Sequence, residues 1–321
     1  MPFTPKSLSW PGKHAVLMVH GIGNASSGGD GAFPIDAVRS MLGDGAATTA
    51  IYRLNYDVIN DWAAAKTDLA AGVSALKSAL KLKFGDDSTS ETIAEYGGDL
   101  LWPVLSADFR FAIRDAFLAQ LQQMQIDRGE AALARGDDPL DYTITIVAHS
   151  LGCFHAYEVL TAAAQEPSHE LQPASDLVTF NAVILMASPV QLLRAVAERI
   201  ATFIPDAGSL ATLSPPLAIP SETKRGRTVP CTTQFVSVTG NFDPVGGHLL
   251  GKKLAWAYMD IPGQKSIIVP QQALNIGDGT SLATALGEAV TAGGAPTLND
   301  PHSWVAYIDG QGALLRSTVL G

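Results

Sequence analysis

The chain has 321 residues, of which 47% are hydrophobic and 16% charged, and its formal net charge at pH 7 is −10. This composition excludes a disordered chain. The acidic balance disfavours nucleic-acid binding, which needs a basic face to neutralise phosphates. A basic cluster, Lys224, Arg225 and Arg227, lies in a stretch rich in Pro and Ser, where we expect an exposed loop.

Targeting and metal-binding signals do not stand out in the sequence. The first 13 residues contain no apolar segment of the signal-peptide type. The longest apolar runs are about half the roughly 20 residues of a membrane helix. We therefore expect a cytoplasmic protein without an integral membrane segment. The two cysteines, Cys153 and Cys231, are too few for a disulfide framework. Because no His, Asp and Glu cluster has metal-ligand spacing, we expect neither a metal nor a cofactor.

Six short apolar runs rich in β-branched residues predict buried strands. They are residues 14–19, 50–56, 142–148, 182–187, 234–239 and 266–269. Apolar stripes at helical spacing separate several of them. These stripes are Leu69, Val73, Leu76 and Leu80; Phe109, Ile113, Phe117, Leu121 and Met124; and Leu193, Val196, Ile200 and Phe203. Strands that alternate with helices predict one α/β domain over residues 1–321, built on a doubly wound, mostly parallel sheet.

Two connections between the predicted strands are too long for simple crossovers. Residues 57–141 separate the second and third strands and must contain more than one helix. Residues 189–230 follow the fourth strand and are rich in Pro from Pro205 onward. Because the sheet resumes after each connection, we interpret 57–141 as a helical insertion and 189–230 as a second, lid-like insertion. Together they are expected to form a wall or lid over the site.

The strongest signal for catalysis follows the third predicted strand. There, Ala-His-Ser-Leu-Gly at 148–152 leads from a buried strand into a helical pattern, as in a nucleophile elbow. The chain turns so sharply at Ser150 that Ala148 and Gly152 must both be small. The turn presents the Ser150 hydroxyl above the sheet and directs the backbone N–H of Leu151 to the same point. Ser150 is therefore the predicted nucleophile.

A second motif, His-Gly-Ile-Gly-Asn at 20–24, directly follows the first predicted strand. Acyl transfer needs a second N–H donor for the oxyanion, and glycines let the backbone turn inward to supply it. We expect the amides of Ile22 and Leu151 to form the oxyanion hole. A dinucleotide-binding loop is disfavoured, because its third glycine would fall at Ser26.

The acid and the base of a catalytic triad follow such a serine in the order acid, then His. We assign the acid to Asp243, in a Pro- and Gly-containing turn after the strand at 234–239, and the base to His302, after the last predicted strand. The alternatives are His248 for the base and Asp206 or Asp260 for the acid. The other polar candidates near these motifs are interpreted as structural residues or bystanders: His20, His149, His155, Cys153 and Asp300.

These residues together resemble the α/β-hydrolase superfamily of lipases and esterases. The opening motif, Gly-Gly-Asp-Leu at 97–100 and the elbow are similar to a group of serine esterases, and the opening and elbow are also similar to small bacterial lipases. The resemblance covers residues 13–307. It implies the α/β-hydrolase fold and hydrolysis of a carboxylic ester, with a small-molecule ester or a lipid as substrate, through Ser150, His302 and Asp243.

Such motifs are specific for a fold and not for a substrate. One alternative is a binding protein that retains the α/β-hydrolase fold without catalysis. Another is a lipid acyltransferase or lipase that works at a lipid surface. Nucleophile, oxyanion loop, acid and base occur here in the chain order that the fold requires, which favours an ester hydrolase.

Overall fold

The computed structural model describes a large part of the chain in separate ranges. They are residues 3–21, 35–56, 59, 107–165, 180–191, 193–194, 222–224, 227–229, 232–241, 243, 245–249, 252–253, 265–269 and 304–320. In chain order the helices and strands are β1 (His14–Val19), α1 (Ile35–Leu42), η3 (Gly43–Thr48), β2 (Thr49–Leu54), α5 (Ala107–Arg135), η4 (Pro139–Asp141), β3 (Thr143–His149), α6 (Leu151–Gln165), β4 (Phe180–Met186), β5 (Glu222–Lys224), β6 (Arg227–Val229), β7 (Thr232–Gly240), β8 (His248–Leu249), β9 (Lys252–Lys253), β10 (Lys265–Val269) and α11 (Trp304–Leu320).

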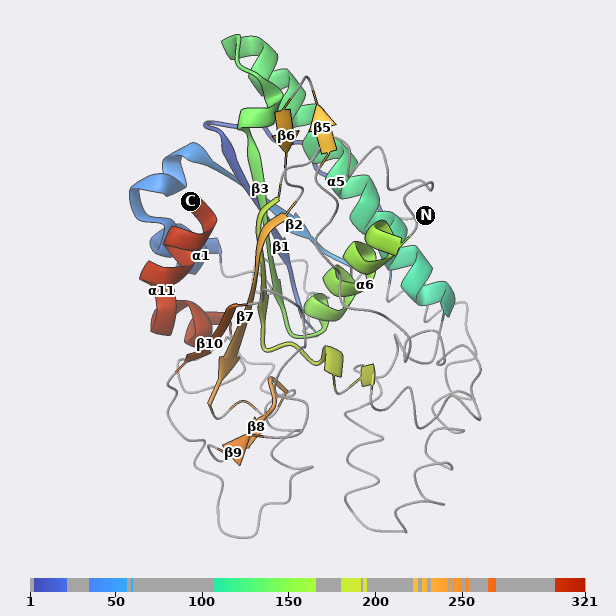
Figure 1. The fold of residues 1–321 in the computed structure, drawn as a ribbon, viewed down its shortest axis with the longest axis vertical. Coiled ribbons are helices and arrows are strands. Elements are labelled where there is room, and N and C mark those ends of the chain that lie inside the picture. The colour runs from blue at the N-terminus through green and yellow to red at the C-terminus, as the bar shows by residue number, and fades with distance from the viewer. Residues whose placement is uncertain are drawn as a thin grey trace.

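A six-stranded sheet with the order β10-β7-β4-β3-β1-β2 runs through the centre of the structure (Figure 1). Every neighbouring pair in it is parallel. The prediction of an α/β fold with a parallel sheet is confirmed. From β1 the chain moves outward to β2, and from β3 it moves outward in the opposite direction to β4. The strand order therefore reverses between β1 and β3, and in open α/β sheets ligands bind at the carboxyl ends of the strands at such a point.

Helices cover both faces of the sheet. In Figure 1, α1 and α11 lie on its left face, and α5 and α6 lie on its right face. The two faces have separate apolar cores, because successive side chains of a strand point to opposite sides. In β1, Leu17 and Val19 belong to the core with α5 and α6, whereas Val16 and Met18 belong to the core with α1 and α11. A strand buried on both sides must be apolar throughout, which is why these strands are visible in the sequence.

The predicted strands coincide with β1, β2, β3, β4, β7 and β10, with ends that differ by two residues at most. The second helical stripe is also confirmed, since its five residues are all buried in α5. They are Phe109, Ile113, Phe117, Leu121 and Met124. The prediction of a loop around Lys224 and Arg227 is wrong in part. The residues on either side of 225–226 form the antiparallel strands β5 and β6, because their backbone groups pair with each other.

The sequence pattern does not predict the C-terminal helix α11. It contains Gly310 and Gly312, each of which lowers helix propensity by about 1 kcal/mol relative to Ala. Its apolar residues are nevertheless buried against α1 and the sheet, among them Tyr307, Ile308 and Leu315. Tertiary packing, and not local propensity, therefore stabilises this helix.

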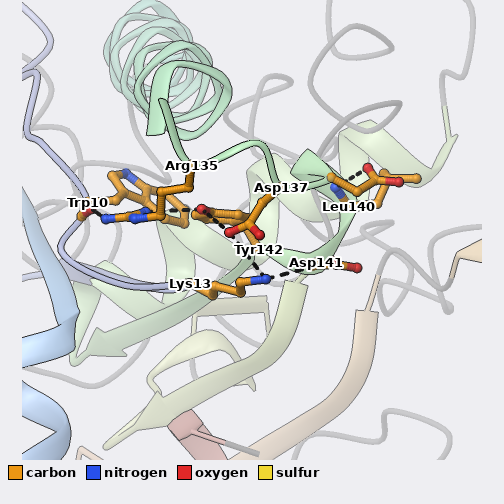
Figure 2. A network of polar contacts seen from close by, with 8 residues as sticks. Trp10, Lys13, Arg135, Asp137, Leu140, Asp141 and Tyr142 are labelled. Carbon is orange, nitrogen blue, oxygen red and sulfur yellow. Dashed lines mark hydrogen bonds and ion pairs between the residues drawn. The ribbon is translucent and has the colours of Figure 1, made fainter. Parts of the chain in front are cut away.

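Polar groups at the amino ends of β1 and β3 bind one another (Figure 2). The Arg135 guanidinium, at the end of α5, donates to the Tyr142 hydroxyl at 3.0 Å and to the backbone carbonyl of Trp10. The Tyr142 hydroxyl in turn donates to Asp137 at 2.9 Å, and the Lys13 ammonium lies 3.3 Å from the same carboxylate. This network ties the segment before β1 to the turn that leads into β3.

Much of the two predicted insertions lies outside the described residues. The helical stripe from Leu69 to Leu80 is among the parts that the structure does not describe, as is most of 189–230. From the insertion 57–141, helix α5 is described, and it packs against α6. None of the helices in the described ranges is both long and apolar enough to cross a membrane.

Candidate active site

Ser150 lies at the turn between β3 and α6, at the point where the strand order reverses. Its φ is 52°, in the left-handed region that residues with a side chain rarely adopt. The backbone is held there from two directions, because Ser150 N donates to the carbonyl of Met186 on β4 at 2.9 Å and its own carbonyl accepts from Cys153 N at 2.9 Å. Such strain is found preferentially at functional sites. The side chain is buried, with 4% of its surface exposed.

Two glycines make this turn compact. A Cβ on Gly21 would lie 2.5 Å from the Cβ of Ser150 and 3.1 Å from its hydroxyl oxygen. A Cβ on Gly152 would collide with the carbonyl oxygens of Val19 and His20. The requirement for a small residue at 152 thus comes mainly from the end of β1, and not only from crowding within the turn. Both glycines let the loop after β1 pack directly against the serine.

The loop after β1 is also held by His20. Its ring stacks on Tyr56 with 4.1 Å between the centroids, and its Nδ1 contacts the carbonyl of Gly21 at 2.5 Å. A carbonyl only accepts, so Nδ1 carries the proton and Nε2 accepts from Tyr56 N at 3.3 Å. Burial lowers the pKa of His20 to about 4, although the hydrogen bonds to Gly21 and Asn55 oppose this shift. A neutral His20 therefore fixes the backbone beside Ser150.

His155, one turn into α6, lies in an aromatic cage behind the serine turn. Its ring is in edge contact with the rings of Tyr56, Phe109 and Phe154, at 4.9, 6.1 and 5.5 Å between centroids. Both ring nitrogens are buried and have no hydrogen-bond partner among the residues that the structure describes. Burial is the largest cause that lowers the pKa of His155, to about 3. The ring is neutral near pH 7 and acts as a packing group.

Asp243 follows β7 and is fully buried, at 0% exposure. Its Oδ1 accepts from Val245 N at 2.9 Å, and its Oδ2 accepts from the Tyr307 hydroxyl at 2.5 Å. Tyr307 comes from α11, so this contact joins the loop after β7 to the C-terminal helix. No feature of the sequence singled out Tyr307, because the two residues are 64 positions apart.

Cys153 lies between the serine turn and the end of β4. Its thiol contacts the carbonyl of Met186 at 3.1 Å, and the residue is fully buried and not in a disulfide. Burial, as the largest cause, raises the pKa of the thiol well above its ordinary value. A thiol in this state is a packing group and a poor nucleophile.

The structure also places a second left-handed residue beside Ser150. Ala187 directly follows β4 and has a φ of 54°, and its N–H donates to the carbonyl of Val238 at 3.0 Å. The carboxyl ends of β3 and β4 thus both leave the sheet through backbone that an L-residue rarely adopts. An alanine in an apolar run carries no sequence signal for such a conformation.

Several residues considered for the site in the sequence analysis lie outside the described ranges. These are Ile22, His302, Asp206, Asp260 and the bystander Asp300. The contact expected between Asp243 and His302 therefore also lies outside the described residues. His248 is described through its backbone, in β8. Among the described residues, no group of three or more His, Cys, Asp or Glu side chains is arranged to hold a metal ion.

Comparisons with known proteins give distant structural similarities. No protein-family model matches the chain, and no curated protein matches it. Among solved structures, a metagenomic carboxyl esterase is similar with a TM-score of 0.37 and 14% identity, covering 98% of this chain and 78% of that one. An uncharacterised protein from Pseudomonas aeruginosa is similar with a TM-score of 0.33 and 12% identity. That alignment covers 94% of this chain and 48% of the other.

Proposed function

We propose that this protein is a serine hydrolase of the α/β-hydrolase fold that cleaves carboxylic esters through an acyl-enzyme. The observation that carries the proposal is the turn at Ser150. The serine has a left-handed φ of 52° between a buried parallel strand and a helix, and Gly21 packs against its side chain. A strained turn from a strand into a helix is typical of a nucleophile elbow and supports this assignment.

The proposed oxyanion hole uses two backbone amides. Leu151 is the first residue of α6, so its N–H is one of the four that have no partner within the helix. The N-terminus of a helix also carries a partial positive charge. The second donor is Ile22, which follows Gly21. Gly21 adjoins the Ser150 hydroxyl, and this supports the proposal that the residue after it supplies the second donor.

The proposed reaction proceeds in two steps. His302 removes the proton of the Ser150 hydroxyl as the oxygen attacks the ester carbonyl, and it then transfers this proton to the alcohol that leaves. The acyl group remains on Ser150. His302 next removes a proton from water, which attacks the acyl-enzyme, releases the carboxylic acid and restores the serine. Asp243 accepts the other ring N–H of His302 and stabilises the imidazolium. These steps need no cofactor.

The proposed substrate is an uncharged, largely apolar ester. The acidic net charge of −10 disfavours anionic substrates. We propose that the insertions 57–141 and 189–230 form the wall or lid over Ser150, within a single domain. The described part of the first insertion supports this placement, because Phe109 of α5 contacts His155, one turn into the helix that follows the serine.

An active-site fluorophosphonate tests this proposal. The probe should label the wild-type protein at Ser150 and leave the Ser150→Ala variant unlabelled. p-Nitrophenyl esters of increasing acyl length should be hydrolysed by the wild type, with the same rate in the presence of EDTA. Absence of both labelling and turnover would favour a binding protein with this fold. Loss of activity in EDTA that zinc restores would contradict a metal-free mechanism.

A further inference from the structure

The hydrogen bonds of Tyr307 have only one consistent direction. Gly240 N, at the end of β7, donates to the Tyr307 oxygen at 2.8 Å, so the tyrosine must direct its single proton elsewhere. The Oδ2 atom of Asp243 lies 2.5 Å away and receives it. Tyr307 and Asp243 are both 0% exposed, so water does not compete for these bonds. The phenol is therefore an oriented donor to the carboxylate.

The carboxylate is held at both oxygens. Val245 N donates to Oδ1 at 2.9 Å while Tyr307 donates to Oδ2, so the group cannot rotate without breaking a buried bond. A carboxylate oxygen can accept more than one hydrogen bond, so these two bonds are compatible with the role proposed for Asp243 as an acceptor for His302.

Tyr307 also lies close in sequence to the proposed base. Helix α11 begins at Trp304, two residues after His302, and Tyr307 is one turn further on. Trp304 and Tyr307 both pack against the ring of His149, the residue before the nucleophile, with centroid distances of 5.0 and 6.1 Å. The first turn of α11 thus contacts the residue next to the serine and binds the acid directly.

We propose that Tyr307 is a positioning residue of the triad: its hydroxyl fixes the Asp243 carboxylate and ties it to the helix that directly follows His302. The proposal rests on the function proposed above, because it takes Asp243 as the acid. Tyr307 has no contact with substrate in this scheme and acts through Asp243 alone.

The groups around the carboxylate keep the phenol a donor. Burial is the largest cause that raises the pKa of Tyr307 well above its ordinary value, and the charge of Asp243 raises it further. The Cys153 thiol, which faces the pair from α6, has a pKa that burial also raises, so it adds no negative charge near pH 7. From β3, the ring that faces the pair is that of His149.

Tyr307→Phe tests the proposal, with Tyr52→Phe as a matched control. Tyr52 is likewise fully buried, and its hydroxyl donates to a carboxylate, that of Asp127, at 2.6 Å. Tyr307→Phe should lower kcat for p-nitrophenyl butyrate by about tenfold to hundredfold with little change in KM, because a displaced catalytic group costs rate rather than binding. Tyr52→Phe should lower the melting temperature and leave kcat unchanged.

The pH profile separates positioning from a structural role. Without the hydrogen bond from the phenol, Asp243 attracts the imidazolium proton more strongly, so the acid limb of kcat/KM should move to higher pH in Tyr307→Phe. Incorporation of 3-fluorotyrosine at 307 keeps the shape and strengthens the donor, so the limb should move to lower pH. The 3-fluorotyrosine variant tests the proposal if Tyr307→Phe does not fold. Unchanged kcat and an unchanged acid limb in a folded variant would overturn the proposal.

Asp243→Asn distinguishes this proposal from the proposed function. If Asp243 is the acid and Tyr307 acts through it, Tyr307→Phe should have no further effect on kcat in the Asp243→Asn background. If Asp243→Asn retains full activity, the assignment of the acid fails. If Asp243→Asn is inactive while Tyr307→Phe is indistinguishable from wild type, the positioning role fails alone.

Discussion

The two ends of the parallel sheet are built differently. At the amino ends of β1 and β3, Lys13, Arg135, Asp137 and Tyr142 bind one another through partly buried hydrogen bonds and one partly exposed ion pair (Figure 2). At the carboxyl ends, Ser150 has a left-handed backbone and Asp243 is buried at 0% exposure.

The difference indicates that the amino end contributes to stability, whereas the carboxyl end has a cost in folding free energy. A residue in a rarely populated backbone region costs about 1–3 kcal/mol, and such residues cluster at functional sites. Ser150 and Ala187 both incur this cost at the carboxyl end. Substitutions there should change activity more than stability, and substitutions at the amino end should do the reverse.

Replacement of the proposed nucleophile should have the largest effect. Ser150→Ala removes the oxygen proposed to attack the ester and should lower kcat by a factor on the order of 10⁶, while the melting temperature changes little. Steady-state hydrolysis of p-nitrophenyl butyrate and a thermal unfolding curve measure the two quantities. Activity within about tenfold of the wild type would contradict the assignment of Ser150.

Two buried aspartates give the sharpest comparison. Asp243→Asn should lower kcat by up to about 10⁴, because the amide cannot hold the imidazole in the required tautomer. Asp127 on α5 accepts from Ser7, Leu8 N, Gln123 and Tyr52, away from the serine. Asp127→Asn should leave kcat unchanged and cost about 1–3 kcal/mol of stability, because the NH2 group that replaces one oxygen cannot accept the two hydrogen bonds that this oxygen receives. Equal effects of the two substitutions on kcat would remove the distinction between the two ends.

The rate should depend on pH through the proposed base. His302 must be neutral to act, and an unperturbed histidine has a pKa near 6.5, so kcat/KM should fall about tenfold per unit well below that value. The negative charge of Asp243 would raise this pKa and move the decline to higher pH. The profile should be measured from pH 5 to 8 at constant ionic strength. A flat profile with chemistry rate-limiting is incompatible with a histidine base.

The free energy of unfolding should decrease in acid because of His155, which lies one turn after Ser150. Its pKa is about 3 in the folded protein, against about 6.5 when unfolded. Between these values the unfolded state binds one more proton, so this term lowers stability as pH falls, by about 1.4 kcal/mol per unit. His155→Phe should remove this pH-dependent term, and the phenyl ring should fit the cage of Tyr56, Phe109 and Phe154. Chemical denaturation at pH 7, 6 and 5 measures how the free energy of unfolding depends on pH. In the variant this dependence should be weaker by about the uptake of one proton.

The smallest effect should come from the exposed ion pairs at the amino end. The Lys13 ammonium lies 3.3 Å from Asp137 and 3.8 Å from Asp141, and all three side chains are at least 28% exposed. Because water screens such pairs, Lys13→Ala should cost about 0–1 kcal/mol and leave kcat unchanged. Denaturation at low and high salt provides the check, since any loss should shrink as salt rises. A change in kcat would show that the two ends are coupled.

Local patterns in the sequence determine the sheet and the turn at Ser150. Strands buried on both faces must be apolar along their length, so β1, β3 and β4 can be read directly from their residues. Small residues at fixed offsets from the serine predict the turn between β3 and α6, and Gly152 is one of them, although the atoms that a side chain there would meet first belong to the end of β1. Both features arise from contacts between neighbours in the chain or in the strand register.

Tertiary structure decided the contacts between distant segments. Helix α11 contains two interior glycines and is stabilised by burial against the sheet, which no local propensity predicts. The bond between Tyr307 and Asp243 joins residues 64 positions apart, and the left-handed φ of Ala187 occurs in an ordinary apolar run. Such features depend on which strands become neighbours. The sequence by itself determined the strands and the sharp turn at the serine, whereas the strand order and the packing of α11 decided what surrounds Asp243.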